Sequence, residues 1–244
     1  MGFNKNTSKA VCYGSPLYAG IGIRCLYLEQ GIQGLQQFIR HWRSGNNISQ
    51  LLLITVAWCQ LSLGTGISFL KDMNRDLPHF EAKWLKGLRS FLRHINGYIE
   101  LDEDYVPPLQ QEGDKHVMDL VLNSSKFSPK QVKSINYCRI YLCVHTLFDL
   151  TKSNGKWIHP EFINGRHTKA TPKCTLSNIL QQKPSPTEWK LWKKENLRWS
   201  TKSGKLYKSL GKWLLPVKEQ RMLRFSYQNI NSGCVYLYNG HHFK

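Results

Sequence analysis

Hydrophobic residues recur every three or four positions through most of the first 150 residues, which is the spacing of helices that bury one face. This pattern predicts helices over about 23–42, 48–63, 79–95 and 114–122. The helix over 48–63 is apolar nearly all the way round, which is typical of a helix central to a core. We expect Asn47 to cap its first turn and Gly64-Thr65-Gly66 to end it.

A fifth helix is predicted from its start signal. The run Ser128-Pro129-Lys130-Gln131 offers a side-chain cap, a proline at the first helical position and a glutamine three residues after the cap. Apolar positions continue at helical spacing to about residue 150, so we expect one helix from 129 to 150.

Beyond residue 150 the pattern changes. Residues 151–186 are mostly polar and predict a long loop with short strands around Trp157-Ile158, followed by a short basic helix over 187–199. Alternating runs predict strands over 98–101, 205–214 and 221–238. The expected fold class is therefore mainly α with a small β component (α+β). A helical body spans 1–150, and a basic loop, short helix and small antiparallel sheet span 151–244.

The net positive charge of the chain lies almost entirely in its second half. Residues 1–122 carry 12 basic and 11 acidic side chains, whereas residues 123–244 carry 22 and 5, and the formal net charge is +18. A charge excess restricted to one half of a chain indicates a surface that meets a polyanion, of which RNA and DNA are the expected examples.

Within that half, lysines alternate with aromatic residues between positions 183 and 213, which suits phosphate contact combined with base stacking. Trp189 and Trp192 share a helix face, and docking of the helix on the body explains them at least as well. The candidate nucleic-acid-binding residues are Lys190, Lys193, Lys194, Arg198, Trp199, Lys202, Lys205, Lys208 and Lys212.

Other candidate chemistry is weak. No nucleophile elbow, phosphate-binding loop or dinucleotide fingerprint occurs, and Cys138, Cys143 and His145 are spaced as core residues rather than as zinc ligands. We expect no catalytic residue, no metal and no cofactor. The alternative is a metal-dependent nuclease or hydrolase that uses the acidic cluster near 102–116, with Asp102, Asp104, Glu112 or His116.

The cellular setting is expected to be intracellular and reducing, without contact with a membrane. Seven cysteines at irregular spacings do not suggest a disulfide framework. The most apolar stretch, 51–63, is 13 residues long, shorter than the roughly 20 that a bilayer span needs.

Short sequence motifs rich in apolar residues and glycine occur along nearly the whole chain. In order they are Met1-Gly2-Phe3-Asn4, Ala10-Val11, Tyr13-Gly14, Gly20-Ile21-Gly22-Ile23, Tyr27-Leu28-Glu29-Gln30-Gly31, Trp58-Cys59-Gln60, Trp84-Leu85, Leu88-Arg89-Ser90-Phe91-Leu92, Ile95-Asn96-Gly97, Asn136-Tyr137-Cys138-Arg139-Ile140-Tyr141-Leu142 and Gly211-Lys212-Trp213-Leu214. Together these motifs resemble the region that follows the polymerase domain in retrotransposon-type (non-LTR-like) reverse transcriptases.

The resemblance implies a catalytically incomplete C-terminal segment of an RNA-directed DNA polymerase from a transposable element. The chain contains no Asp-Asp pair, so no polymerase residue of that family can be carried over. The resemblance implies a thumb- or connection-like role for the helical body over 1–150. It also implies non-enzymatic binding of RNA or DNA, with the polymerase domain of the same polyprotein as a further partner. Ile23, Leu26, Trp42 and Trp58 are candidates for the surface facing that domain. A further hypothesis is that the chain is the product of a degenerate open reading frame and has no function.

Overall fold

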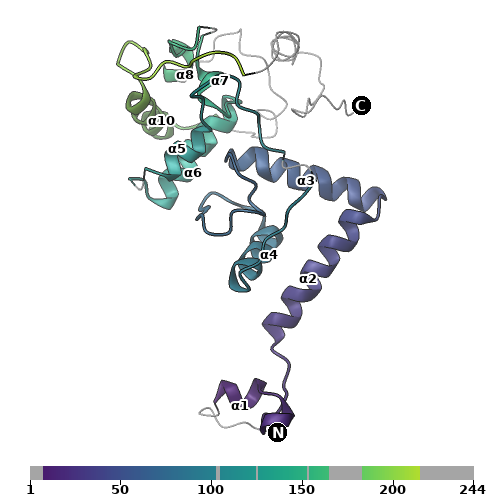
Figure 1. Ribbon diagram of the computed structural model, residues 1–244. Coiled ribbons are helices and arrows are strands. Elements are labelled where there is room, and N and C mark those ends of the chain that lie inside the picture. The colour runs from purple at the N-terminus through teal and green to yellow at the C-terminus, as the bar shows by residue number, and fades with distance from the viewer. Residues whose placement is uncertain (1–7, 103–104, 125, 153, 165–182, 215–244) are drawn as a thin grey trace. The chain divides into compact units, whose positions relative to one another are not determined.

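The structure is a computed structural model that describes residues 8–102, 105–124, 126–152, 154–164 and 183–214. These residues are mainly helical, as predicted, and their β structure is limited to isolated antiparallel bridges. The elements (Figure 1) are α1 Lys9–Tyr13, the 3₁₀ helix Pro16–Tyr18, α2 Leu26–Arg43, α3 Asn47–Leu63, α4 Lys83–His94, α5 Val117–Leu122, α6 Pro129–Tyr141, α7 Leu147–Leu150, α8 Pro160–Asn164 and α10 Pro186–Trp199.

The predicted strands are the weakest part of the sequence interpretation. Residues 98–101 form no strand, and the backbone N–H of Ile99 makes one bond to the carbonyl of Leu70 at 2.9 Å. The segment 205–214 contributes only isolated bridges, at Lys205, Leu206 and Trp213. The run 221–238 lies outside the described residues.

The chain divides into two compact units. The N-terminal unit comprises Met1–Thr55 and Ala82–Tyr98, and the C-terminal unit comprises Val56–Glu81 and Ile99–Lys244. Residues on both sides of position 150 therefore belong to one unit.

In the N-terminal unit, α2 packs against α4. Gly31 allows this approach, because a Cβ there would lie 2.1 Å from Cδ2 of Phe91. Phe38 is buried between Trp42 and Trp84, with ring centroids 5.7 Å and 6.2 Å away.

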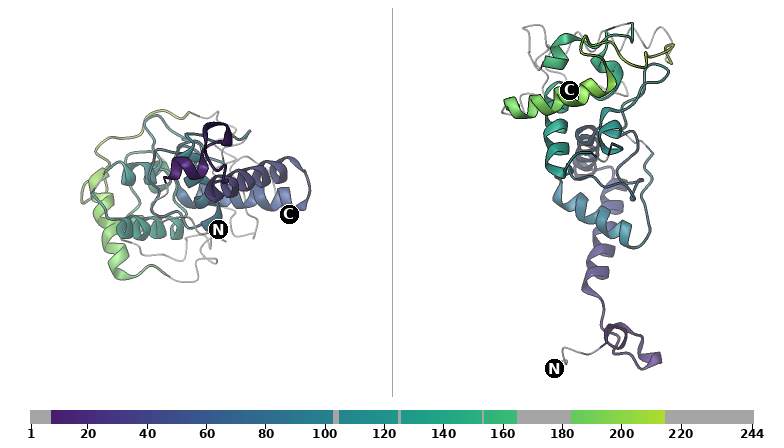
Figure 2. Two further views of the ribbon diagram at one scale, coloured as in Figure 1. Left: turned by 90° about the horizontal axis from the view of Figure 1, so that it is seen from below. Right: turned by 90° about the vertical axis from the view of Figure 1, so that its left-hand side faces the viewer.

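In the C-terminal unit, α6 is the central helix: α10 and α5 both pack against it, and α8 contacts α10 (Figures 1 and 2). The apolar side chains of this unit form one buried cluster, which includes Met118, Ile135, Cys138, Leu150 and Trp192. Burial raises the pKa of the Cys138 thiol, which marks it as a packing residue rather than a reactive thiol.

Helix α6 begins at the predicted cap but is shorter than predicted. Ser128 and Gln131 form the reciprocal capping box, with Pro129 in the first turn. The helix ends at Tyr141 rather than near 150, and the chain turns at Cys143, whose φ is +56°. The prediction of one helix over 129–150 is therefore wrong, and α7 is a separate short helix.

Arg139 of α6 explains why the chain turns there. Its side chain is fully buried, and each of its five N–H groups has an acceptor. Nε donates to Oδ1 of Asn136 at 2.9 Å, and Nη1 donates to the Val144 carbonyl at 3.0 Å and to Nδ1 of His145 at 3.1 Å. Nη2 donates to the carbonyls of Leu61 and Ser62, at 2.9 Å and 2.6 Å.

These last two bonds provide donors for carbonyl groups in the last turn of α3, which have no N–H partner within the helix. The neighbouring Leu63 carbonyl accepts from Nε2 of His79 at 3.0 Å. Gly64 follows with a φ of +66°, and its Cα faces the guanidinium, since a Cβ there would lie 2.6 Å from Cζ of Arg139. The predicted end of the helix at Gly64 is thus confirmed. Besides its left-handed backbone, the close approach of Arg139 requires a glycine here, and the sequence did not reveal that contact.

Replacing Gly64 with alanine should destabilise the fold, because the left-handed backbone and the Arg139 contact both exclude a Cβ. We expect the free energy of unfolding to fall by about 2 kcal/mol or more in urea titrations. Gly34→Ala is the control: it lies inside α2 with nothing within 4 Å of the added Cβ, and it should stabilise by roughly 0.5–1 kcal/mol. Equal effects of the two substitutions would contradict this account.

The stability of the fold should decrease as the pH falls from 6.5 towards 4. Burial lowers the pKa of His79 from 6.5 to about 4, so the unfolded chain binds a proton that the folded chain resists across this window. His79→Gln keeps a side-chain N–H that can donate to the Leu63 carbonyl. Between pH 6.5 and 4, the free energy of unfolding should fall by up to about 3 kcal/mol less in this variant than in the unmodified protein, as measured in unfolding titrations. A pH dependence of stability that is the same in His79→Gln as in the unmodified protein would contradict the assignment.

Candidate nucleic-acid interface

Helix α10 separates its aromatic and basic residues onto different faces. A capping box between Ser185 and Glu188 starts the helix, with Pro186 in the first turn. Trp192 is fully buried, and its Nε1 donates to the Phe162 carbonyl at 2.7 Å. Because α10 uses this side for packing, the tryptophans orient the helix and the lysines face solvent.

The other tryptophans of the basic segment also pack inward. Trp189 is half-buried and meets the ring of Tyr141 edge-on, with centroids 5.9 Å apart. Trp199, a predicted binding residue, is half-buried against the apolar cluster of the C-terminal unit. Docking on the body therefore accounts for Trp189 and Trp192, and Trp199 contributes to the same packing.

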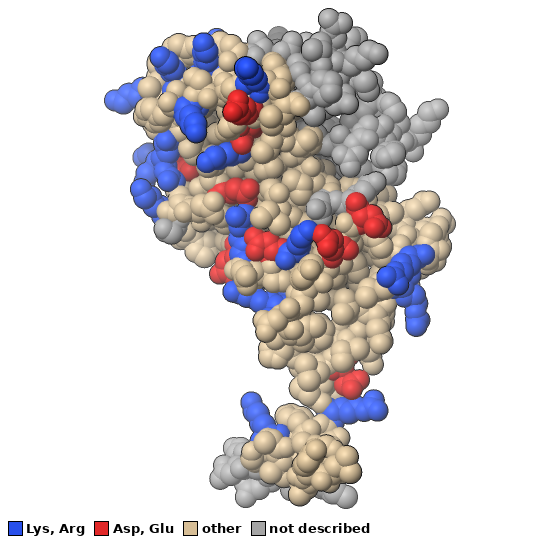
Figure 3. Space-filling model, in the orientation of Figure 1, with Lys and Arg blue, Asp and Glu red and all other residues tan. Residues whose placement is uncertain are grey.

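The predicted lysines are all exposed. We call the following seven residues the lysine surface: Lys190, Lys193, Lys194, Lys202, Lys205, Lys208 and Lys212. Over 183–214 the chain carries nine basic and two acidic residues, and one of the two acids, Glu195, is fully buried. Figure 3 shows blue side chains gathered over the region where Figure 1 places α10 and α6.

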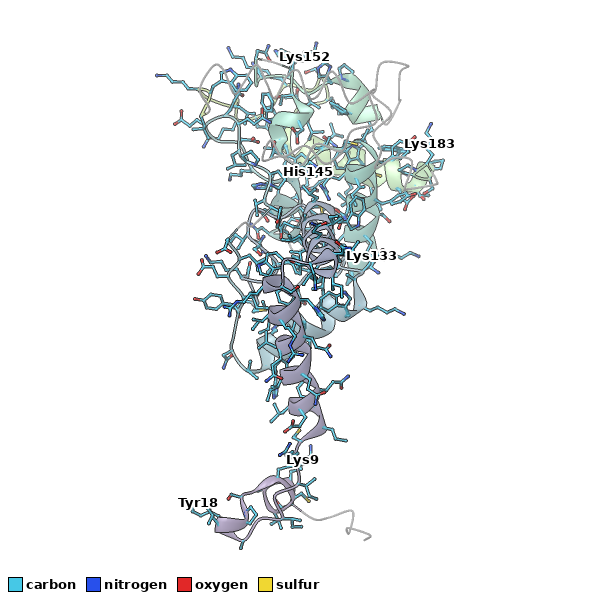
Figure 4. All side chains as sticks on the ribbon, turned by 90° about the vertical axis from the view of Figure 1, so that its right-hand side faces the viewer. Lys9, Tyr18, Lys133, His145, Lys152 and Lys183 are labelled. Carbon is cyan, nitrogen blue, oxygen red and sulfur yellow. The ribbon has the colours of Figure 1, made fainter. Side chains whose placement is uncertain are left out.

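Helix α6 adds cations that the sequence interpretation did not include. Lys130 and Lys133 are exposed on α6, Lys126 precedes it, and Lys183 precedes α10 (Lys133 and Lys183 are labelled in Figure 4). No acidic residue lies between 123 and 148. Their place beside α10 depends on the packing of α10 on α6, which is a tertiary contact. The sequence signal for them as binding candidates is the run of lysines beside the Ser128 cap.

Arg198 is exposed like the lysines but differs from them, since its guanidinium pairs with the carboxylate of the buried Glu195. Its Nη1 donates to both carboxylate oxygens of Glu195 at 3.0 Å, and its Cζ lies 5.9 Å from the centre of the Phe127 ring. Burial raises the pKa of Glu195, and the contact with Arg198 opposes that rise. We therefore assign Arg198 first to the stability of α10 and only second to binding.

The residues of the alternative interpretation that the structure describes are Asp102, Glu112 and His116. Asp102 and Glu112 are exposed, Asp104 lies outside the described residues, and Nε2 of the buried His116 hydrogen-bonds the Pro107 carbonyl at 2.7 Å. Within the described ranges, no group of three or more His, Cys, Asp or Glu side chains could hold a metal ion. Cys138, Cys143 and His145 likewise form no metal cluster there.

Asp114, a neighbour of these residues, is a structural carboxylate. It is buried and accepts from the backbone N–H groups of Gln110, Lys115 and Phe148 at 3.3, 2.8 and 3.0 Å. Burial raises its pKa, while these backbone bonds oppose the rise. Its role is to join the loop before α5 to the start of α7.

No helix within the part of the chain that the structure describes is long and apolar enough to cross a membrane.

Replacing Arg198 with alanine should destabilise the C-terminal unit, because Glu195 would remain buried without its cation. We expect a loss of about 1–3 kcal/mol in the free energy of unfolding. Lys194→Ala, on the exposed side of the same helix, should change stability by no more than about 0.5 kcal/mol. Thermal and urea unfolding of the two variants measure this difference, and an Arg198→Ala protein as stable as wild type would refute the structural role.

Comparisons with known proteins assign no family to the chain: no family model, no curated protein and no solved structure matches it. The functional argument therefore depends on the geometry of the residues described above.

Proposed function

We propose that this chain binds RNA or DNA without sequence preference, through contacts between the lysine surface and the sugar-phosphate backbone. The observation that carries the proposal is the arrangement of α10, whose tryptophans face the core while Lys190, Lys193 and Lys194 face solvent. Such a surface presents positive charge with few acidic residues beside it, which is the electrostatic pattern of nucleic-acid-binding proteins.

Lysine is suited to this role because its ammonium group is a point charge on a flexible stem that can reach phosphates in many geometries. Contacts to phosphate fix a protein on the strand but carry no sequence information. They also release bound counterions, so the affinity should fall steeply as salt is added.

The resemblance to the post-polymerase region of retroelement reverse transcriptases supports a non-enzymatic role beside a polymerase. In that setting the polymerase domain is the proposed neighbour of this chain. Leu26 is 83% exposed and Ile23 is also exposed, whereas Trp42 and Trp58 are partly buried. Of the four residues that the sequence suggested for this contact, the two aliphatic ones are therefore the better candidates.

The proposal predicts the behaviour of a variant in which Lys190, Lys193, Lys194 and Lys212 are all replaced by glutamine. Its affinity at low salt should fall about 10-fold or more, and by similar factors for RNA and DNA of different sequence. The slope of log affinity against log salt should shrink by about three, because each lost phosphate contact removes roughly 0.7–0.9. Fluorescence anisotropy with labelled oligonucleotides measures both quantities.

A matched control removes the same number of charges from the N-terminal unit by replacing Lys9, Arg43, Lys83 and Lys86, all exposed, with glutamine. This control should bind nearly as well as the unmodified protein. Equal losses in both variants would show that only total charge matters, and an unchanged affinity in the first variant would place the site elsewhere.

A further inference from the structure

The buried tryptophans leave a question about the proposed interface, namely which aromatic groups could contact the bases of a bound strand. Within the described part of the C-terminal unit, the large aromatic side chains that remain exposed are Trp157, at 38%, and Tyr207, at 68%. Trp157 was predicted only as part of a strand, and Tyr207 was not among the candidate binding residues.

Antiparallel bridges bring these two residues to the same place. Trp157 pairs with Lys205, and Leu206 pairs with Ser200. The N–H of Leu206 donates to the Lys156 carbonyl at 2.9 Å, and the N–H of Tyr207 donates to the Trp199 carbonyl at 3.0 Å. The bridges therefore connect residues 156–158 to 204–207, and 204–207 to the end of α10.

Burial alternates from Gly204 to Tyr207 as it does in a strand, and in the partner segment Trp157 is exposed beside the buried Ile158. Ile158 and Leu206 are buried, at 2% and 3%, and anchor the segments in the apolar cluster. Trp157, Lys205 and Tyr207 are exposed on the other side. Because adjacent side chains of an extended chain point to opposite faces, these three share the outer face.

We propose that Trp157 and Tyr207 form an aromatic pair that stacks on unpaired bases of a single-stranded nucleic acid, while Lys205 between them contacts phosphate. Diagonal neighbours across such a bridge lie about 7–8 Å apart, which gives a base access to either ring. Lys208 and Lys152 are exposed next to Tyr207 and near Trp157, and Figure 4 shows Lys152 at the outer edge of the molecule.

Anchoring of the backbone matters because base stacking is favourable only if the aromatic residue loses little conformational freedom on binding. Leu206, and Leu210 with its N–H bonded to the Gly155 carbonyl at 2.9 Å, hold the backbone on both sides of Tyr207. An aromatic side chain on a fixed backbone has only two side-chain torsions to restrict. The arrangement combines stacking rings with cations, which is how proteins bind single strands without reading their sequence.

This inference rests on the proposed function and adds to it the kind of strand that is bound. It predicts that the full chain prefers a 12-nucleotide oligothymidine to a 12-unit abasic chain with the same phosphates. We expect the preference to be about 5-fold or more in fluorescence anisotropy at low salt, since stacking on one aromatic residue is worth at least that factor.

The Trp157→Ala/Tyr207→Ala double variant should lose this preference while keeping its affinity for the abasic chain, because the lysines are unchanged. Tyr207→Phe should retain the preference. Tyr98→Ala is the matched control, since Tyr98 is 61% exposed but belongs to the N-terminal unit. It should behave as the unmodified protein does.

The outcomes separate the two claims. Equal affinity of the unmodified chain for the oligothymidine and the abasic chain overturns the aromatic pair and leaves the lysine surface supported. A preference that persists in Tyr207→Ala and in the double variant also overturns it. Failure to bind either ligand at low salt overturns the proposed function, and the aromatic pair with it.

Discussion

The end of helix α3 lies against α6 and must have its last carbonyl groups hydrogen-bonded, because a carbonyl that is removed from water without a partner costs free energy. Arg139 meets most of this requirement. Its Nη2 donates to the Leu61 and Ser62 carbonyls, and its Nη1 donates to the Val144 carbonyl and to His145 in the turn. His145 accepts this bond on Nδ1, and burial lowers its pKa well below its usual range, so the ring stays neutral beside the cation.

This one side chain fixes the central helix of the C-terminal unit. The bonds of Arg139 join the turn after α6 to the last turn of α3. Helix α10 packs against α6. The packing of Trp192 then determines which side of α10 meets solvent. The arrangement of the surface thus follows from the core: the aromatic side of α10 is used for packing, and Lys190, Lys193 and Lys194 lie on its exposed side.

Features that depend on local sequence were predictable. The mainly helical class, the cap at Ser128 and the end of α3 at Gly64 each follow from residues within a few positions. The start of α10 has the same capping box, formed by Ser185 and Glu188, with Pro186 in the first turn. This motif places the start of the helix at Pro186, one residue before the expected start at 187.

Features that depend on contacts across the chain were not predictable. No glycine or proline marks the turn at Cys143, because acceptors near Arg139 stabilise it instead. An arginine in a basic stretch is expected at the surface, so its burial gave no sequence signal. For the interface, composition identified the lysines correctly as exposed residues, but it could not separate Arg198, which bonds Glu195, from its neighbours. Nor could it show that Trp157 lies beside Lys205.

The central claim is that the lysine surface holds nucleic acid through its phosphates. The most direct test is the affinity of the unmodified chain for a single-stranded oligonucleotide, measured across a range of salt concentrations. The account predicts a straight line of log affinity against log salt, with a negative slope of about 0.7 for each phosphate contacted and a total slope of several units. An affinity that does not change with salt, or no binding at low salt, would contradict it.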